Sequence, residues 1–252
     1  MKKNETLTQK LKDTQEIEFK WSVQSTKDYK IFLNEVQKLK AILGTPRLLD
    51  IHDYYLDTSN HMFSLAKTSC RLRNENEIWE LTLKARTQLE QGLAQRREKT
   101  YSLPSPSSFS NALQYTQQKI LKNLLGSSHL KKKFEIKNER LSQKLTLPDQ
   151  TQGEICFDQA LLIHRDQKIP LQEIELEFLK GNLAHFLSFI KKITQRTQAR
   201  PAQISKVATA LKKFSLDNQK IDLTKSALST KTFSQQAAEK VKMFLCLKAS
   251  EV

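Results

Sequence analysis

The chain contains the stretch Glu16-Ile17-Glu18-Phe19-Lys20, in which charged and apolar residues alternate. Successive side chains of a β-strand point to opposite faces, so this pattern predicts a strand with one charged and one apolar face. Taken alone, such a charged row is most often the solvent face of an antiparallel strand whose other face is buried. The role of the charged row therefore depends on what the other strands present.

The same alternation returns in later segments of the chain. Seven further strand-like runs are expected, at residues 52–57, 69–73, 78–86, 95–102, 132–145, 153–158 and 173–179. Most of them carry acids and bases at alternate positions, which suits a closed barrel with a polar interior and an apolar exterior covered by helices. We therefore expect an α+β fold, an eight-stranded antiparallel β-barrel with flanking helices and a C-terminal helical tail.

The expected boundaries divide the chain into a polar leader over residues 1–14, a barrel domain over 15–214, and a linker with a C-terminal helix over 215–252. The first flanking helix is predicted over 28–43, because apolar residues recur there at helical spacing up to Gly44. The tail helix could dock on the barrel, dimerise or bind a partner, and docking is favoured.

The net charge of the 252-residue chain is +15, which indicates an anionic partner. Nucleic acid, a membrane surface and small polyphosphates all qualify, so charge alone does not choose among them. The run Lys131-Lys132-Lys133 is either the solvated start of a strand or a contact for a polyanion. Nucleic acid is a possible partner that the sequence does not favour.

The cysteines and the apolar runs exclude further classes of protein. Cys70, Cys156 and Cys246 are widely spaced and form no CxxC, so neither a zinc site nor a disulfide framework is supported. A reducing, cytoplasmic setting fits best. No run approaches the ~18 apolar residues of a membrane span, and no membrane partner is expected.

Acids and bases that share an interior need compensation, because each buried charge costs several kcal/mol unless it is paired or bound. A polyphosphate with divalent metal ions would supply it. Arginine binds phosphate oxygens through two parallel hydrogen bonds and lysine acts as a point charge. Carboxylates are the natural ligands of Mg²⁺ or Mn²⁺, which in turn bridge phosphate oxygens.

Several short motifs follow the first strand along the chain. They are Tyr54-Tyr55-Leu56-Asp57-Thr58, Arg71-Leu72-Arg73, Thr82-Leu83-Lys84, Arg96-Arg97-Glu98, Phe134 with Arg140, Gly153-Glu154-Ile155 to Asp158, Glu173-Ile174-Glu175-Leu176-Glu177 and Ser205-Lys206. In this order they resemble the motifs of the CYTH domain, the triphosphate tunnel metalloenzyme superfamily, and are most similar to its bacterial inorganic triphosphatase branch. The first strand is similar to the family's ExExK signature.

The resemblance implies a role for each matching residue. The divalent metal would be held by Glu16, Glu18, Glu175 and Glu177. The triphosphate would be bound by Lys20, Arg71, Arg73, Lys84, Arg96, Arg140 and Lys206. Glu98 would orient Arg96 or a metal-bound water, and Lys20 or a carboxylate could accept a proton from the attacking water. Glu173, Glu175 and Glu177 share one strand face, so the pattern itself does not decide which of them are ligands.

The implied activity is metal-dependent hydrolysis of a triphosphate, with inorganic tripolyphosphate favoured over other substrates. Thiamine triphosphatase, nucleoside or RNA triphosphatase and adenylate cyclase activities are alternatives within the same superfamily. A non-catalytic module that binds polyphosphate or nucleic acid is the alternative from another class.

Overall fold

The computed structural model describes residues 11–85, 89–197, 199–216 and 228–246, with side chains described from 235 onward in the last segment. The strands are β1 (Leu11–Ser22), β2 (Ile42–Leu43), β3 (Arg47–Thr58), β4 (Thr68–Glu75), β5 (Ile78–Ala85), β6 (Leu93–Ser102), β7 (Leu130–Thr146), β8 (Gln152–His164), β9 (Gln167–Lys180) and β10 (Arg200–Pro201). The helices are α1 (Thr26–Lys38), α2 (Met62–Leu65), α3 (Phe109–Tyr115), the π-helix η1 (Thr116–Ile120), α4 (Lys122–Leu125), α5 (Leu183–Thr197), α6 (Lys206–Lys213) and α7 (Leu228–Cys246).

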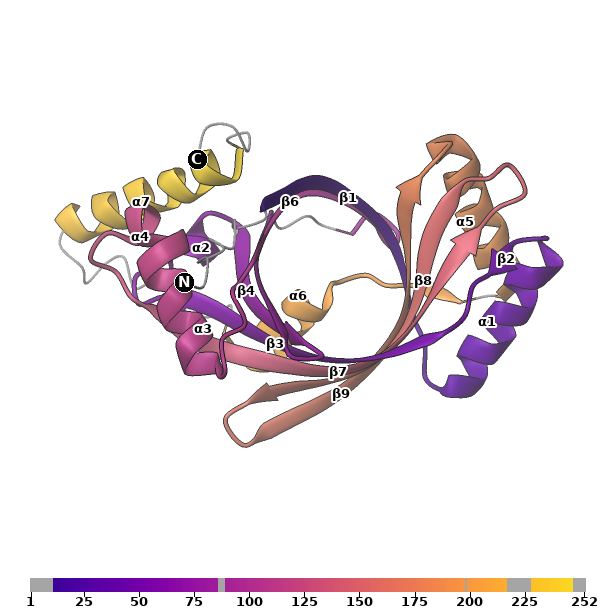
Figure 1. Ribbon diagram of the computed structural model, residues 1–252, viewed down its shortest axis with the longest axis horizontal. Helices are drawn as coiled ribbons and strands as arrows, with labels where there is room; N and C mark the ends of the chain where they lie inside the picture. The colour runs from indigo at the N-terminus through magenta and orange to yellow at the C-terminus, as the bar shows by residue number, and fades with distance from the viewer. Residues whose placement is uncertain (1–10, 86–88, 198, 217–227, 247–252) are drawn as a thin grey trace, which may run out of the picture.

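Eight strands close into an antiparallel barrel, as the alternating pattern predicts. They pair in the order β1-β6-β5-β4-β3-β7-β8-β9, and a β1–β9 pairing closes the ring. Figure 1 looks through this ring, with helices packed on opposite sides of it. The two-residue strands β2 and β10 pair at the margins, with β7 and β1.

Two expected boundaries differ from the structure. β1 begins at Leu11, so residues 11–14 of the expected leader belong to the barrel, because β1 pairs with β6 from Leu11↔Tyr101 onward. The first flanking helix ends at Lys38 instead of Leu43. Lys40 has a positive φ of 60°, and the residues after it pair with β7 as β2. The linker expected before the C-terminal helix lies largely outside the described residues.

Two apolar clusters cover the outside of the barrel. On one side, α1 and α5 bury Phe32, Val36 and Phe186 against the outward residues of β1, β8 and β9, Trp21 among them. Trp21 also donates from its indole nitrogen to Thr194 Oγ1 of α5 (2.9 Å). With the outer face of the strands covered by apolar packing, the alternate residues must face the interior of the barrel.

On the other side, α2, α4 and α7 pack over β4, β5 and β6. Val241 and Leu245 of α7 are buried in this cluster with Leu72 and Leu81 of the strands. The C-terminal helix is therefore docked on the barrel, as favoured from the sequence. Arg97 and Lys99 of β6 donate to the carbonyl oxygens of Cys246 and Phe244 in the last turn of α7, at 2.7 and 2.8 Å.

The inner face of the barrel changes from charged to apolar along β7 and β8. Arg140 and Asp158 lie in the charged part, whereas Ile136 and Leu162, on the same faces of the two strands, belong to a third apolar cluster. Leu211 of α6 packs on this cluster, and α6 lies within the outline of the ring in Figure 1. The helix therefore covers one end of the interior and leaves the charged part as the cavity.

Candidate functional site

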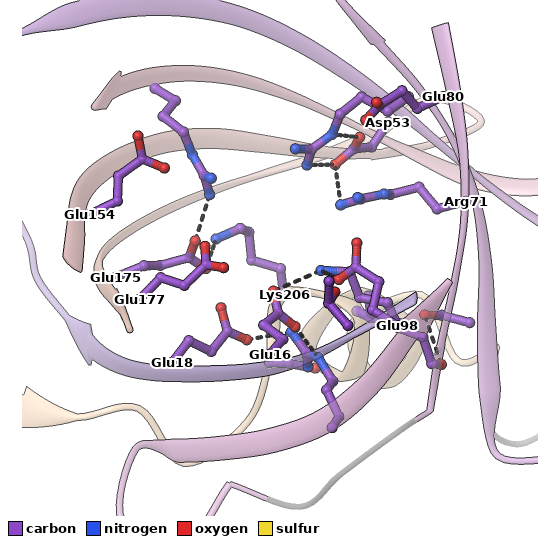
Figure 2. A pocket seen from close by; sticks show the side chains of 18 of the residues that line it. Glu16, Glu18, Asp53, Arg71, Glu80, Glu98, Glu154, Glu175, Glu177 and Lys206 are labelled. Carbon is purple, nitrogen blue, oxygen red and sulfur yellow. Dashed lines mark hydrogen bonds and ion pairs between the residues drawn. The ribbon is translucent and has the colours of Figure 1, made fainter. Parts of the chain in front are cut away.

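The interior of the barrel holds a cavity of about 550 Å³. Every site residue expected from the sequence lines it: Glu16, Glu18, Lys20, Arg71, Arg73, Lys84, Arg96, Glu98, Arg140, Glu175, Glu177 and Lys206. In Figure 2, the labelled members of this set converge on the cavity from several strands and from α6: Glu16, Glu18, Arg71, Glu98, Glu175, Glu177 and Lys206. Residues up to 190 positions apart in the chain thus meet in one site because the barrel closes between β1 and β9.

The charges of the described lining residues balance. The nine basic side chains are Lys12, Lys20, Arg47, Arg71, Arg73, Lys84, Arg96, Arg140 and Lys206. The nine acidic side chains are Glu16, Glu18, Asp53, Glu75, Glu80, Glu98, Glu154, Glu175 and Glu177. A cavity of this kind offers many fixed charges of both signs and little net charge.

On β1, β5 and β6, Glu16 joins two cations. Its carboxylate accepts from Lys84 Nζ (2.9 Å) and from Arg96 Nε (2.6 Å). Burial alone would raise the pKa of Glu16, but these two cations outweigh burial and hold the pKa well below its usual range. Lys84 also forms an ion pair with Glu98 (2.6 Å), whose pKa is lowered for the same reason. Glu16 and Glu98 are therefore ionised at neutral pH.

On β3 and β4, Asp53 holds the arginines. Asp53 accepts two hydrogen bonds from Arg73, at 2.7 and 2.9 Å, and its carboxylate lies 3.5 Å from Arg71. Arg71 also donates to Thr82 Oγ1 (3.3 Å), while its buried Nε has no hydrogen-bond partner among the described residues. Asp53 was not among the site residues expected from the sequence; the β3–β4 register places it opposite Arg73.

On β7, β8 and β9, Arg140 and Lys206 bind a group of carboxylates. Arg140 donates two hydrogen bonds of 2.7 Å to Asp158 and a third, of 2.5 Å, to Glu175. Lys206 Nζ lies 2.6 Å from Asp158 and 2.8 Å from Glu175, and it also contacts Glu173. Ser205 caps α6 and thereby aims Lys206 back into the cavity, its hydroxyl accepting from Ala208 N at 3.2 Å.

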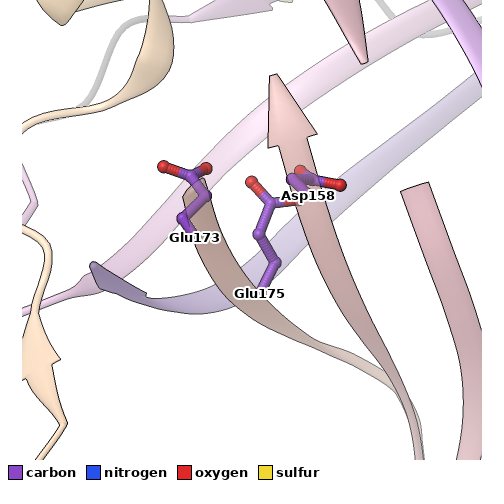
Figure 3. A group of neighbouring side chains, drawn as sticks. All are labelled: Asp158, Glu173 and Glu175. Atoms are coloured by element: carbon purple, nitrogen blue, oxygen red, sulfur yellow. The ribbon is translucent and has the colours of Figure 1, made fainter. Parts of the chain in front are cut away.

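Asp158, Glu173 and Glu175 lie close enough together to hold a metal ion, with ligand oxygens within 4.8 Å of one another (Figure 3). The ammonium of Lys206 already contacts all three carboxylates. Burial alone would lower the pKa of Lys206, but these acids raise it well above its usual value. In this structure the three carboxylates therefore surround a lysine ammonium.

Glu177 differs from the other acids of the cavity. Among the described residues no side chain forms a hydrogen bond or ion pair with its carboxylate. Its register partners are Glu18 on β1 and Glu154 on β8, so three carboxylates stand side by side on adjacent strands. Burial, followed by the charges of Glu16 and Glu18, raises the pKa of Glu177 to about 7.

This row of carboxylates fits a divalent cation, because a cation beside Glu177 would supply the positive charge that the position lacks. Glu16, Glu18 and Glu175 of the expected ligand set are each already paired with cations of the protein. Glu16 and Glu18 lie on the inner face of β1, and Glu175 and Glu177 on that of the adjacent β9. Of the four, Glu177 is the one that forms no ion pair with a described residue.

Lys20 lies at the junction of these groups. Its Nζ is 3.0 Å from Glu18 and contacts Glu175, and the side chain is buried. Burial alone would lower the pKa of Lys20, but Glu175 and Glu18 raise it above its usual value. Lys20 is therefore a fixed positive charge in this arrangement.

Comparison with known proteins places the fold and the motifs in one family. Residues 14–211 match the model of the CYTH domain, which is most of the chain. The chain belongs to the CYTH domain family. It is also 27% identical to the inorganic triphosphatase of Haemophilus influenzae over 139 residues, which are 55% of this chain and 39% of the length of that protein. The alignment thus spans well under half of that relative.

Two solved structures have the same fold. A Hippeastrum protein studied as an adenylyl cyclase, and described as having a dominant triphosphatase activity, superposes with a TM-score of 0.55 at 14% identity, over 79% of this chain and 96% of its own. A candidate adenylate cyclase of Bacillus halodurans superposes with a TM-score of 0.52 at 19% identity, over 78% and 97%. At these identities the likeness shows the fold alone.

None of the helices that the structure describes is long and apolar enough to cross a membrane.

Proposed function

We propose that this protein hydrolyses a triphosphate in the barrel cavity, with inorganic tripolyphosphate, cleaved to pyrophosphate and phosphate, as the favoured substrate. The observation that carries the proposal is the ring of seven basic side chains from five strands and α6 around one cavity: Lys20, Arg71, Arg73, Lys84, Arg96, Arg140 and Lys206. Such a ring can contact the oxygens of successive phosphates from several directions. The similarity to an inorganic triphosphatase supports the same reading.

The charge balance of the cavity supports a requirement for divalent metal. Nine acids offset nine bases among the described lining residues, so the protein alone offers little net charge for a polyanion. Mg²⁺ or Mn²⁺, when bound, would neutralise phosphate charge and bridge phosphate oxygens. Glu16, Glu18, Glu175 and Glu177 would hold the ion, with Glu177 as the ligand that has no cation of its own.

The remaining side chains would bind and orient the substrate. Phosphoryl transfer depends mainly on positioning and on stabilisation of charge, so no covalent nucleophile is needed. Arg71 and Arg73, held by Asp53, would contact phosphate oxygens from one wall. Lys84 and Arg96 would do so from the other, with Glu98 fixing the position of Lys84. A water then attacks the terminal phosphorus in line with the leaving oxygen.

Proton transfer from that water is best assigned to a carboxylate. Lys20 was a candidate base from the sequence, but its pKa is raised by Glu175 and Glu18, which keeps it protonated. As an ammonium it would bind phosphate oxygens and stabilise the developing charge. Glu177 is a proposed metal ligand and would be ionised with the metal bound, so Glu98, which is not one of the four proposed ligands, is the carboxylate assigned to this water.

The aromatic side chains that line the cavity favour an inorganic substrate. Among the described lining residues these are Tyr55 and Phe178. Tyr55 is stacked on Phe134 (ring centroids 4.6 Å apart), and Phe178 packs edge-on against Phe186 (5.3 Å). Both rings already pack against a neighbouring aromatic side chain, which leaves less ring surface on which adenine or thiamine could stack.

A phosphate-release panel tests the proposal. Purified protein is assayed with tripolyphosphate, ATP, thiamine triphosphate and long-chain polyphosphate, with Mg²⁺ or Mn²⁺ and with a chelator. We expect metal-dependent release, fastest from tripolyphosphate. Arg96→Ala should abolish release, whereas Lys137→Ala, an exposed lysine on β7, should not. Absence of release from every substrate, or full activity of Arg96→Ala, would contradict the proposal.

A further inference from the structure

The excess positive charge of the chain lies outside the cavity. The net charge is +15, whereas the nine bases and nine acids that line the cavity cancel. The lysine run at residues 131–133, which the cavity does not use, marks one place where this charge gathers. It lies at the start of β7, at the end of the barrel covered by α6.

Three segments distant in the chain meet at this place. His164, at the end of β8, is joined through Nδ1 to the carbonyl oxygen of Lys133 (2.7 Å). The ring of His164 also packs against Phe214, directly after α6, with centroids 5.5 Å apart. Lys133 and Leu211 of α6 line the same small cavity of about 30 Å³. The α6 surface, as we name it, is formed by Lys131, Lys133, Arg165, Lys212 and Lys213.

Few acids offset this surface. Lys131, Arg165, Lys212 and Lys213 are exposed, and no described carboxylate forms an ion pair with them. Asp57, the register partner of Lys131, is buried and accepts hydrogen bonds from the backbone nitrogens of Thr58 and Phe63 and from Ser64. Asp166, next to Arg165 at the tip of the β8–β9 hairpin, is an exposed acid beside these bases.

We propose that the α6 surface binds the phosphate backbone of a nucleic acid, independently of sequence and of the catalytic cavity. The surface holds none of the exposed large apolar residues of the described chain, which are Ile31, Ile42, Leu48, Ile78, Leu179, Leu187, Ile204 and Met243. Protein interfaces depend on aromatic and apolar anchors, and membrane-surface helices insert an apolar face. A lysine surface without such anchors instead suits a nucleic acid, because lysines that contact its phosphates release the bound counterions.

The test measures binding of a labelled single-stranded RNA with a 5′-hydroxyl, which presents no triphosphate to the cavity. The variant Lys131→Glu/Lys212→Glu/Lys213→Glu reverses three charges of the α6 surface. Lys30→Glu/Lys191→Glu/Lys192→Glu makes the same change on the exposed sides of α1 and α5. Circular dichroism and melting temperature check that both variants fold.

We expect the first variant to lose at least about tenfold in affinity and the control variant to lose much less. The slope of log Kd against log salt should fall by about 2 in the first variant, since each single-strand phosphate contact contributes about 0.7. Arg96→Ala should leave RNA binding unchanged, which separates this result from the fate of the proposed hydrolysis.

Four results would overturn the inference. They are an absence of RNA binding by the unaltered protein, equal losses in the two triple variants, and a matching loss of RNA binding in Arg96→Ala. The fourth is a selective loss of binding to anionic lipid vesicles, rather than to RNA, in the α6-surface variant.

Discussion

Glu177 of β9 lies directly opposite Glu18 of β1 at the seam that closes the barrel, and the two carboxylates differ in their partners. Glu18 forms ion pairs with Lys20 and Arg96. Glu177 has no partner among the described residues, and its pKa is raised to about 7 by burial and by the neighbouring acids. The carboxylate of Glu18 is therefore neutralised by cations of the protein, whereas that of Glu177 is suited to bind an added cation.

Glu177→Gln should stabilise the metal-free protein at alkaline pH. The pKa of this carboxyl is about 7 in the folded state against 4.5 as a model value, so folding favours its protonated form. Its contribution to stability is present below about pH 4.5 and is lost as pH rises through 7. We expect the variant to melt about 2–4 °C higher than the unaltered protein at pH 8 and at a similar temperature at pH 4.5.

Thermal unfolding across this pH range, with a chelator present, measures the effect, and Glu139→Gln, an exposed acid on β7, is the control. Parallel curves for Glu177→Gln and the unaltered protein would show that the carboxyl titrates normally. Mn²⁺ should then raise the melting temperature of the unaltered protein more than that of Glu177→Gln, because binding to the folded state alone stabilises it.

Asp53→Asn should lower kcat for tripolyphosphate by about 10–100-fold without raising KM, since small displacements of positioning groups cost this much. The amide keeps one acceptor oxygen for Arg73 but removes the charge that holds Arg73 and Arg71 in place. The two arginines would still attract the anion while aligning it less well. Steady-state kinetics of Asp53→Asn beside Arg73→Ala, in which KM should rise, separate alignment from binding. A raised KM with unchanged kcat in Asp53→Asn would contradict the positioning role.

Asp53 also shows where reasoning from the sequence ends. The barrel itself could be predicted, because period-two alternation of charged and apolar residues returns in eight segments and is confirmed by the closed ring. On β3, however, His52 and Tyr54 occupy the outward positions that apolar residues fill elsewhere, so the two faces look alike in sequence. A register shift between Tyr55 and Leu56 interrupts the alternation further.

The pairing within the cavity could not be read from the sequence either. Lys206 was expected near phosphate through its motif, but its contacts with Asp158 and Glu175 depend on how α6 packs across the end of the barrel. Alternation places a residue on a face and leaves its partners across the cavity undetermined. The difference between Glu177 and the paired acids could not be predicted for the same reason, because it depends on which side chains lie near each carboxylate in the folded barrel.

Val241→Asp should detach α7 from the barrel. Val241 is fully buried in the apolar cluster with Leu72 and Leu81, and an unpaired carboxylate there costs several kcal/mol. Hydrogen exchange followed by mass spectrometry should show faster exchange in α7 and little change in β7–β9. Met243→Asp, on the same helix at a side chain 59% exposed, should leave exchange unchanged. Equal effects of the two substitutions would mean that Val241 does not anchor the helix.

Glu16→Ala with Glu18→Ala distinguishes an enzyme from a module that only binds polyanions. The double variant removes two proposed metal ligands and leaves Lys84, Arg96 and Lys20 with fewer acid partners. We expect phosphate release to fall by about 100-fold or more, in line with the loss of preorganised charge stabilisation. Calorimetric binding of tripolyphosphate without metal should persist or tighten, because the cavity becomes more positive.

Glu77→Ala/Glu139→Ala, which removes two exposed acids, is the matched control. If hydrolysis survives in the Glu16/Glu18 variant, these carboxylates do not hold the catalytic metal; if the unaltered protein only binds, the barrel is a receptor for polyphosphate.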